Sequence, residues 1–225
     1  MEFPELAAHA GQEVSLRSRA HRIPSTGCNV IARKGANARR RVVLFAHIDA
    51  RIGTPGANDN ASGVVVLLLL AELLAGYAGS LGVEIVAMNG EDYYACPGQM
   101  QYLARNAGRF GEIALGINLD DVGYCRGNVA YSLYGCPADL AGSIRAVFSA
   151  HTDLVEGEPW YQGDHGLFLM QQVPALALTS DRLVEFMAEI AHSPRDTPDI
   201  VDTTKLTSAA FALRDLLLHL DQHPA

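Results

Sequence analysis

The stretch RVVLFAHIDA, residues 41–50, decides the fold. Its continuous apolar run is typical of a strand that is buried on both faces. The run ends on the polar residues His47 and Asp49. Open α/β sheets place their binding sites at the carboxyl ends of their strands. The stretch therefore predicts a buried strand that delivers two polar side chains to a site.

Two later stretches have the same form. Residues 83–92 are strand-like and end on Glu91 and Asp92, and residues 113–121 end in the same way on Asp120. Parallel strands that end at one edge of a sheet bring their last residues close together. We therefore expect these acidic side chains to converge with those of the first strand on one site.

The other apolar stretches predict a single three-layer α/β domain, residues 1–225, with a mostly parallel, mixed sheet and helices on both of its faces. Residues 28–35 are expected to form a hairpin with the strand at 41–50. Residues 63–79 predict a buried core helix, because the run is too short for a membrane span and Glu72 interrupts it. The other expected elements are helices at 96–108, 137–151, 182–190 and 203–220 and strands at 128–135 and 173–180.

Composition narrows the classes of partner and the cellular setting. Hydrophobic residues make up 49% of the 225 residues and charged residues 19%, which fits one soluble domain with a large core. A net charge of −8, with Arg39–Arg41 as its main basic cluster, argues against nucleic acid or an anionic membrane as partner. The N-terminal residues lack a secretory signal pattern, so a cytoplasmic location is expected unless a signal has been trimmed. The four cysteines fit no zinc pattern and are expected to be free thiols. The oligomeric state is left open.

The polar side chains at the strand ends, together with two others, have the chemistry of a metal centre. Zinc binds imidazole nitrogen and carboxylate oxygen, and two catalytic ions about 3.5–4 Å apart need a ligand that touches both. Four carboxylates, those of Asp59, Glu91, Asp92 and Asp120, would balance the charge of two divalent ions. The candidate ligands, with zinc as the expected metal, are His47, Asp59, Asp92, Asp120 and His192.

The length and position of each side chain at the site indicate its role. Asp59 is the best bridging candidate, because a carboxylate has two oxygens and Asp59 lies in a short turn directly before the core helix. Glu91 has the longer side chain of the acidic pair and is expected to act as general base while Asp92 binds metal. Asp49 is expected to accept the spare ring N–H of His47. Asp121 is expected to contact a capping or supporting partner rather than metal.

Five motifs in order, AHIDA, PGANDNASG, NGED, NLDDVG and AHSPRDTPD, resemble those of the co-catalytic zinc aminopeptidases of peptidase clan MH, the aminopeptidase Y and bacterial leucyl aminopeptidase type. The resemblance covers about residues 28–202. It implies a zinc-dependent exopeptidase that hydrolyses the N-terminal peptide bond through a metal-activated water, with Glu91 as general base. It also implies two zinc ions per chain and peptide substrates with a free N-terminus.

Carried over residue by residue, the resemblance assigns each ligand a place. It implies that Asp59 bridges both ions and precedes a cis peptide bond to Asn60. One ion would then be completed by Asp92 and His192, and the other by His47 and Asp120.

The chain departs from the family pattern at two positions. The usual acidic pair is Glu-Glu, whereas this chain has Glu91 and Asp92, and the residue before the last ligand is Ala191 rather than a polar oxyanion donor. The segment YQGDHGLF resembles the family's substrate-side motif and predicts three substrate-binding residues, Tyr161, Asp164 and His165. Asp164 fits a turn or capping role equally well. The aromatic residues Tyr93, Tyr94, Trp160 and Tyr161 fit either an apolar specificity pocket or ordinary packing.

Two other functions stay open. Glutaminyl cyclases are similar, but they use a single zinc ion and act as acyltransferases that release ammonia. The intact DNASG at residues 59–63 is closer to the peptidase pattern. A catalytically silent metal-binding protein is conceivable because of Asp92 and Ala191, although Glu91 and every ligand-type side chain are present.

Overall fold

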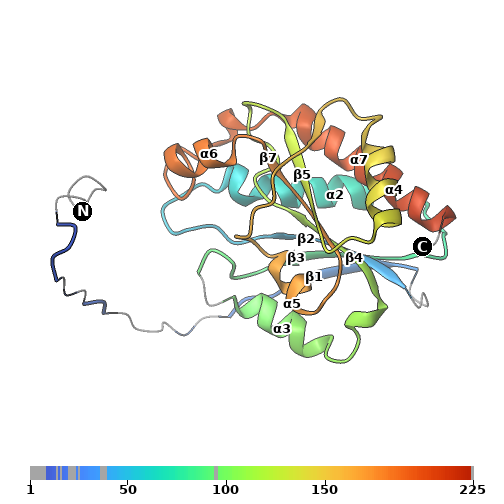
Figure 1. The fold of residues 1–225 in the computed structure, drawn as a ribbon, viewed down its shortest axis with the longest axis horizontal. Helices are drawn as coiled ribbons and strands as arrows, with labels where there is room; N and C mark the ends of the chain where they lie inside the picture. The colour runs from blue at the N-terminus through green and yellow to red at the C-terminus, as the bar shows by residue number, and fades with distance from the viewer. Residues whose placement is uncertain are drawn as a thin grey trace.

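The apolar stretch at residues 41–47 forms the fully buried strand β2 near the centre of one sheet. The computed structural model describes residues 9–13, 15, 17–19, 24, 26–35, 40–93 and 96–223. In this part of the chain seven strands follow the order β1-β3-β2-β4-β7-β5-β6 (Figure 1). They are β1 (Val30–Lys34), β2 (Arg41–His47), β3 (Gly82–Met88), β4 (Ile113–Leu119), β5 (Val129–Tyr134), β6 (Leu154–Glu156) and β7 (Ala175–Ser180).

Strands β3, β2, β4 and β7 run parallel to one another and form the middle of the sheet. The strands β1 and β5 pair antiparallel with β3 and β7, and β6 pairs parallel with β5. The predicted class, an α/β fold with a mostly parallel, mixed sheet, is therefore confirmed.

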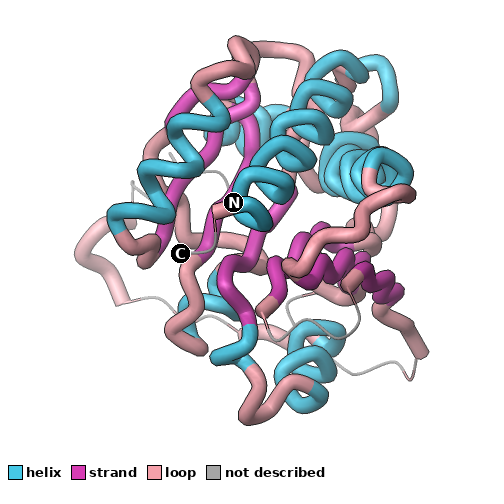
Figure 2. The backbone as a smooth tube through the Cα atoms, turned by 90° about the vertical axis from the view of Figure 1, so that its right-hand side faces the viewer, coloured by secondary structure: helices cyan, strands magenta, loops and turns pink. Residues whose placement is uncertain are grey.

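Helices cover both faces of the sheet, as the alternation along β2 requires. Val42 and Leu44 belong to the apolar cluster beneath one helical layer, and Val43 and Phe45 belong to the cluster beneath the other. The first layer contains α2 (Gly63–Leu73), α4 (Ala138–Phe148) and α7 (Thr203–Gln222), and the second contains α3 (Pro97–Arg105) and α5 (Gly166–Met170). In Figure 1 these two groups lie above and below the strands, and the view turned by 90° shows the same arrangement (Figure 2).

Two expectations about local structure are wrong. No hairpin joins β1 to β2, because β3 lies between them and occupies one edge of β2 while β4 occupies the other. The mostly exposed β1 is an edge strand instead. The helix α2 is also not fully buried, since only one side of it faces the sheet and Leu68 on the other side is 65% exposed. The short elements β6 and α5 were not predicted from the sequence.

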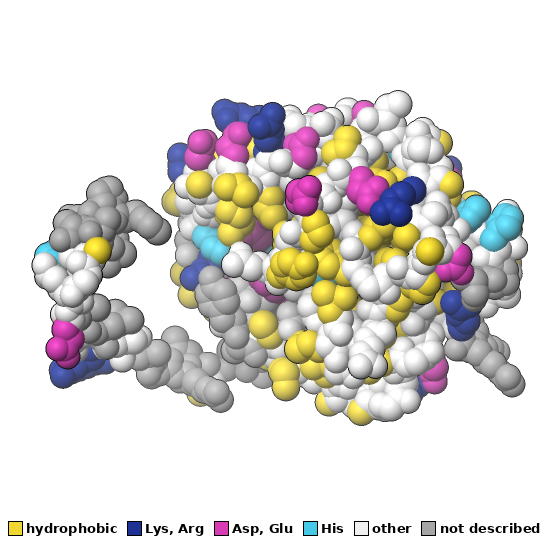
Figure 3. Space-filling model, in the orientation of Figure 1, with side chains coloured by type: hydrophobic (Ala, Val, Ile, Leu, Met, Phe, Trp, Pro, Cys, Tyr) yellow, Lys and Arg dark blue, Asp and Glu magenta, His cyan; other side chains and the backbone are white. Residues whose placement is uncertain are grey.

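Three further observations concern the helices, the cysteines and the surface. Among the described residues, every helix is too short or too polar to span a membrane. All four cysteines are free thiols, as predicted. On the face shown in Figure 3, basic side chains lie in small separate groups among acidic and apolar ones.

Candidate metal centre

The five predicted ligands meet at the carboxyl edge of the parallel strands. His47 is the last residue of β2, and Asp120 directly follows β4. Asp92 lies in the loop after β3, and Asp59 lies in the helical turn η1 (Ala57–Ser62) that leads into α2. His192 lies in the loop after α6 (Leu183–Glu189). Elements that are far apart in the sequence thus deliver one side chain each to the same place.

The two carboxylate oxygens of Asp59 face different partners. Asp59 Oδ1 lies 3.0 Å from His47 Nε2, which is in turn 3.4 Å from Asp120 Oδ1. Asp59 Oδ2 lies 3.2 Å from His192 Nε2, which is in turn 2.9 Å from Asp92 Oδ1. Each oxygen therefore has its own couple of one imidazole and one carboxylate. The peptide bond between Asp59 and Asn60 is cis, as the resemblance implies.

Burial and unmet polar atoms show that this donor set fits a divalent metal. The side chains of His47, Asp59, Asp92 and Asp120 are buried, whereas that of His192 is 30% exposed. Asp92 Oδ2 and Asp120 Oδ1 are buried and have no hydrogen-bond partner in the described structure. Buried carboxylate oxygens without donors are costly, and imidazole and carboxylate are the ligands that zinc prefers. Two overlapping groups, His47 with Asp59 and Asp92, and Asp59 with Asp120 and Asp121, are compact enough to hold an ion.

Crowding of the carboxylates shifts the proton affinities of the cluster. Burial, followed by the charge of Asp120, raises the pKa of Glu91 to about 8. Burial also raises the pKa of Asp92 and of Asp120. Burial alone would lower the pKa of His47, but the Asp120 and Asp59 carboxylates raise it well above its usual value. Without metal, the cluster therefore holds protons that a bound cation would displace.

These shifts predict that stabilisation by zinc grows with pH. A group whose pKa is raised by folding stabilises the fold at low pH, and this contribution is lost as the pH rises through the folded pKa, which is about 8 for Glu91. The metal-free protein should lose that contribution between pH 5.5 and pH 8, whereas the zinc-loaded protein should not. We expect the difference in Tm between the two forms to increase by about 2–8 °C over this range, as about 1–2 kcal/mol would give at this size.

Thermal unfolding of chelator-treated and zinc-loaded samples measures this difference. Groups outside the cluster, such as His165, whose pKa burial lowers, are present in both samples and cancel. A Tm difference that stays constant or shrinks toward pH 8 would contradict the prediction.

Asp49 supports the site in a different way from the one expected. His47 Nδ1 lies 3.0 Å from the backbone carbonyl of Asp49, while the nearest Asp49 carboxylate oxygen is 3.9 Å away. The carboxylate instead accepts the backbone N–H groups of Gly90 at 2.6 Å, Glu91 at 3.2 Å and Asp92 at 3.1 Å. Asp49 therefore holds the His47 ring with its carbonyl and the loop of Glu91 and Asp92 with its carboxylate.

A cavity of about 340 Å³ opens onto the cluster. All five predicted ligands line it together with Glu91, and its remaining wall consists of Asp121, Trp160, Gln162, Gly163, Leu183 and Met187. The last four of these residues were not predicted from the sequence as part of the site. Leu183 and Met187 come from α6, and no chemical signal in the sequence marks an apolar residue as part of a cavity wall.

The predicted substrate-side residues lie near this cavity but are not in its lining. Tyr161 is 78% exposed, with its ring against that of Tyr134. Asp164 is buried and accepts a hydrogen bond from Gln99, and burial raises its pKa to about 6. His165 is buried and its Nε2 lies 2.9 Å from the carbonyl of Trp160, which does line the cavity. Their substrate-binding roles stay predictions.

The other aromatic candidates have separate outcomes. Tyr93 is half exposed and donates a hydrogen bond to the Ala50 carbonyl rather than lining the cavity. Tyr94 lies outside the described residues. Among the three described aromatics of this set, only Trp160 forms part of the cavity wall.

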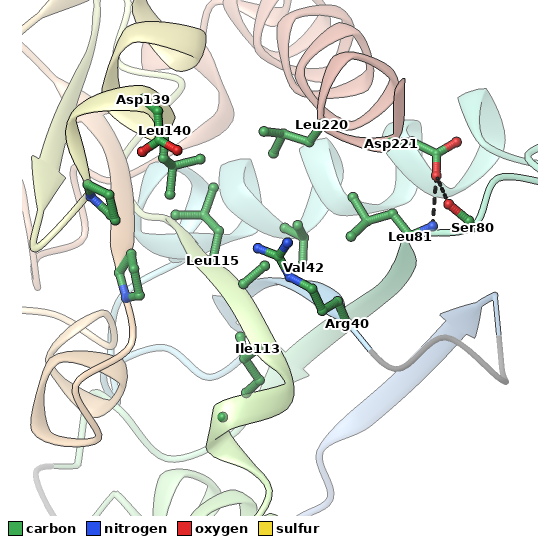
Figure 4. A pocket seen from close by; sticks show the side chains of 14 residues that line it. Arg40, Val42, Ser80, Leu81, Ile113, Leu115, Asp139, Leu140, Leu220 and Asp221 are labelled. Atoms are coloured by element: carbon green, nitrogen blue, oxygen red, sulfur yellow. Dashed lines mark hydrogen bonds between the residues drawn. The ribbon is translucent and has the colours of Figure 1, made fainter. Parts of the chain in front are cut away.

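A larger cavity of about 540 Å³ lies at the opposite edge of the sheet (Figure 4). Its walls include Val42 and Ile113, which stand at the amino ends of β2 and β4. Asp221 at its rim accepts hydrogen bonds from Ser80 Oγ and the backbone N–H of Leu81. Because it lies away from the buried histidines and carboxylates, it does not share the candidate metal centre.

The fold and the cluster define an α/β protein with a buried histidine and carboxylate centre that can hold metal ions. The chain belongs to peptidase family M28, whose family model matches residues 29–217. This confirms the resemblance to the clan MH zinc aminopeptidases.

This chain matches only part of the length of each relative. YfbL of Escherichia coli K12, an uncharacterised protein, is 37% identical over 81 residues, which cover 31% of this chain and 25% of YfbL. BSAP, a zinc aminopeptidase from Bacillus subtilis, superposes with a TM-score of 0.70 at 22% identity, over 84% of this chain and 48% of that one. A glutaminyl cyclase from Bacteroides thetaiotaomicron gives a TM-score of 0.67 at 24% identity, over 88% of this chain and 77% of that one. The chain thus spans about half the length of BSAP, and both structures share its fold.

Proposed function

We propose that this chain is a two-zinc aminopeptidase that removes N-terminal residues from peptides. His47 and Asp120 would hold one ion, Asp92 and His192 the other, and Asp59 would bridge them. One observation carries the proposal: the two carboxylate oxygens of Asp59 lie 3.0 Å and 3.2 Å from different imidazoles, those of His47 and His192. Each imidazole is paired with a carboxylate of its own, Asp120 at 3.4 Å and Asp92 at 2.9 Å. A site for a single ion needs only one such couple.

The chemistry divides between the metals and the chain's own residues. Zinc bound here would supply Lewis-acid activation of water and of the peptide carbonyl. Glu91 would take the proton from the attacking water and deliver it to the leaving amine, as a general base and then a general acid. The Asp49 carboxylate, which accepts the N–H groups of Gly90, Glu91 and Asp92, would keep Glu91 and the ligand Asp92 at fixed positions.

The cavity suits the amino end of a peptide. Its acidic side chains attract a positively charged α-amine, and such charge-assisted contacts are strong where water is excluded. Its remaining wall offers the apolar side chains of Trp160, Leu183 and Met187. These features support a preference for a free N-terminus and for an apolar first residue.

Acetylating the substrate's amine is expected to abolish hydrolysis. The neutral amide can no longer make the charge-assisted contact with the acidic cavity. Incubating matched peptides, one with a free and one with an acetylated N-terminus, and separating the products by chromatography measures this. Equal cleavage of both peptides would rule out aminopeptidase specificity.

The glutaminyl cyclase alternative is supported by the similarity of fold alone. The same incubation separates the two activities if one peptide begins with glutamine. Conversion of that peptide to its pyroglutamyl form with release of ammonia, and without hydrolysis, would favour the cyclase.

A further inference from the structure

Two buried side chains outside the proposed ligand set connect the loops that carry the ligands. Asp196 and Asn58 are both fully buried. Asp196 lies four residues after His192 in the same loop, and Asn58 directly precedes Asp59. Neither residue lines the cavity. Their contacts show what they do for the site.

Asp196 connects the loop of His192 to the turn of Asp59 through hydrogen bonds. Its Oδ1 accepts the backbone N–H of Asn58 at 2.7 Å, and its Oδ2 accepts the backbone N–H of Asp59 at 3.1 Å. Its backbone carbonyl accepts the N–H of Ala57 at 3.2 Å. Three successive N–H groups of the turn therefore end on one residue of the neighbouring loop.

Asn58 connects the same turn to the loop that follows β4, also through hydrogen bonds. Its Oδ1 accepts the backbone N–H of Gly123 at 3.0 Å, and its Nδ2 donates to Asp121 Oδ1 at 3.3 Å. Asp120, the proposed ligand, directly precedes Asp121. The turn of Asp59 is thus held from one side by the His192 loop and from the other by the Asp120 loop.

We propose that Asp196 and Asn58 are positioning residues that set the separation between Asp59 and its partners in each half of the metal centre. Asp196 sets the distance from Asp59 to His192, and Asn58 sets the distance from Asp59 to Asp120. The inference rests on the proposed two-metal function. Residues that orient metal ligands without touching the metal are typically worth 10–100-fold in metal affinity.

The chemistry of the contact explains why an aspartate is needed at position 196. Two neighbouring N–H groups require two acceptors, and a carboxylate offers one oxygen to each. An asparagine has almost the same shape, but its NH₂ group would face one of these donors. Asp196→Asn therefore disrupts the contact while changing the volume of the buried residue very little.

Zinc binding to Asp196→Asn, measured by competition with a chromophoric chelator, tests the proposal. The matched control is Asp199→Asn, which makes the same change of charge at an exposed position three residues further along, in the short 3-10 helix η3 (Pro198–Ile200). Wild type and Asp199→Asn are expected to bind two ions per chain. In Asp196→Asn one of the two dissociation constants should rise by about 10–100-fold. The absorption spectrum of the cobalt-substituted protein should change for that ion, while a role in stability alone would change only Tm.

The outcomes separate this inference from the function on which it rests. Two ions in wild type and unchanged dissociation constants in folded Asp196→Asn would overturn the positioning role, even if Tm fell. Fewer than two ions in wild type would instead contradict the proposed two-zinc function. If Asp196→Asn does not fold, Asn58→Ala decides: a weakened ion supports the role, and wild-type affinity for both ions overturns it.

Discussion

Glu91→Gln is expected to lower the kcat of peptide hydrolysis by at least about a hundredfold while both metal ions stay bound. Removing a general base costs about 10²–10⁴-fold, and glutamine keeps the size of the side chain but cannot take up the proton. Glu91 lines the cavity beside the ligands but belongs to neither couple on Asp59. Burial and the Asp120 carboxylate raise its pKa to about 8 in the metal-free site, which shows that its surroundings favour the protonated form.

Activity and metal content should be measured on the same preparation of this variant. Asp92→Asn is the matched comparison, since it makes the same chemical change one residue further along and should lose an ion. If Glu91→Gln released metal while Asp92→Asn kept both ions, the two roles would have to be exchanged.

Asp59→Asn is expected to leave less than one metal ion per chain and no detectable hydrolysis. An asparagine offers one oxygen, so it cannot serve both the His47 side and the His192 side, where the two Asp59 oxygens now lie 3.0 Å and 3.2 Å from the imidazoles. Losing a shared ligand therefore weakens both ions together. No single change at an unshared ligand should have so large an effect.

Asp121→Asn serves as the control for this variant. Asp121 is also buried near Asp59 and Asp120, but its Oδ1 accepts a hydrogen bond from Asn58, which an asparagine oxygen can still accept. The variant Asp121→Asn should therefore keep both ions, and elemental analysis after gel filtration measures this. Equal loss of metal from both variants would mean that Asp121 holds metal as well as Asp59.

Some of the candidate ligands could be predicted from the sequence because they stand where hydrophobic patterns end. His47 and Asp120 directly terminate buried apolar runs, and strand ends of a parallel sheet converge whatever the details of the loops. The position of His192 came from the family motif rather than from any strand. All three lie in the cluster.

Other features depend on packing that no local pattern specifies. The short connection between β1 and β2 suggested a hairpin, but β2 satisfies both of its edges with the parallel strands β3 and β4. The apolar run of α2 has no period, so it could not reveal which residues, such as Leu68, remain exposed. The spacing of His47 and Asp49 predicted a contact between their side chains, yet the Asp49 carboxylate is taken up by the N–H groups of the Glu91 loop.

Diffraction from crystals grown with zinc, with data recorded at the zinc absorption edge, tests the two-metal centre most directly. The expected result is two anomalous peaks about 3.5–4 Å apart, one beside His47 and Asp120 and the other beside Asp92 and His192, with Asp59 between them. A single peak held by one couple, or peaks away from Asp59, would contradict the two-zinc centre.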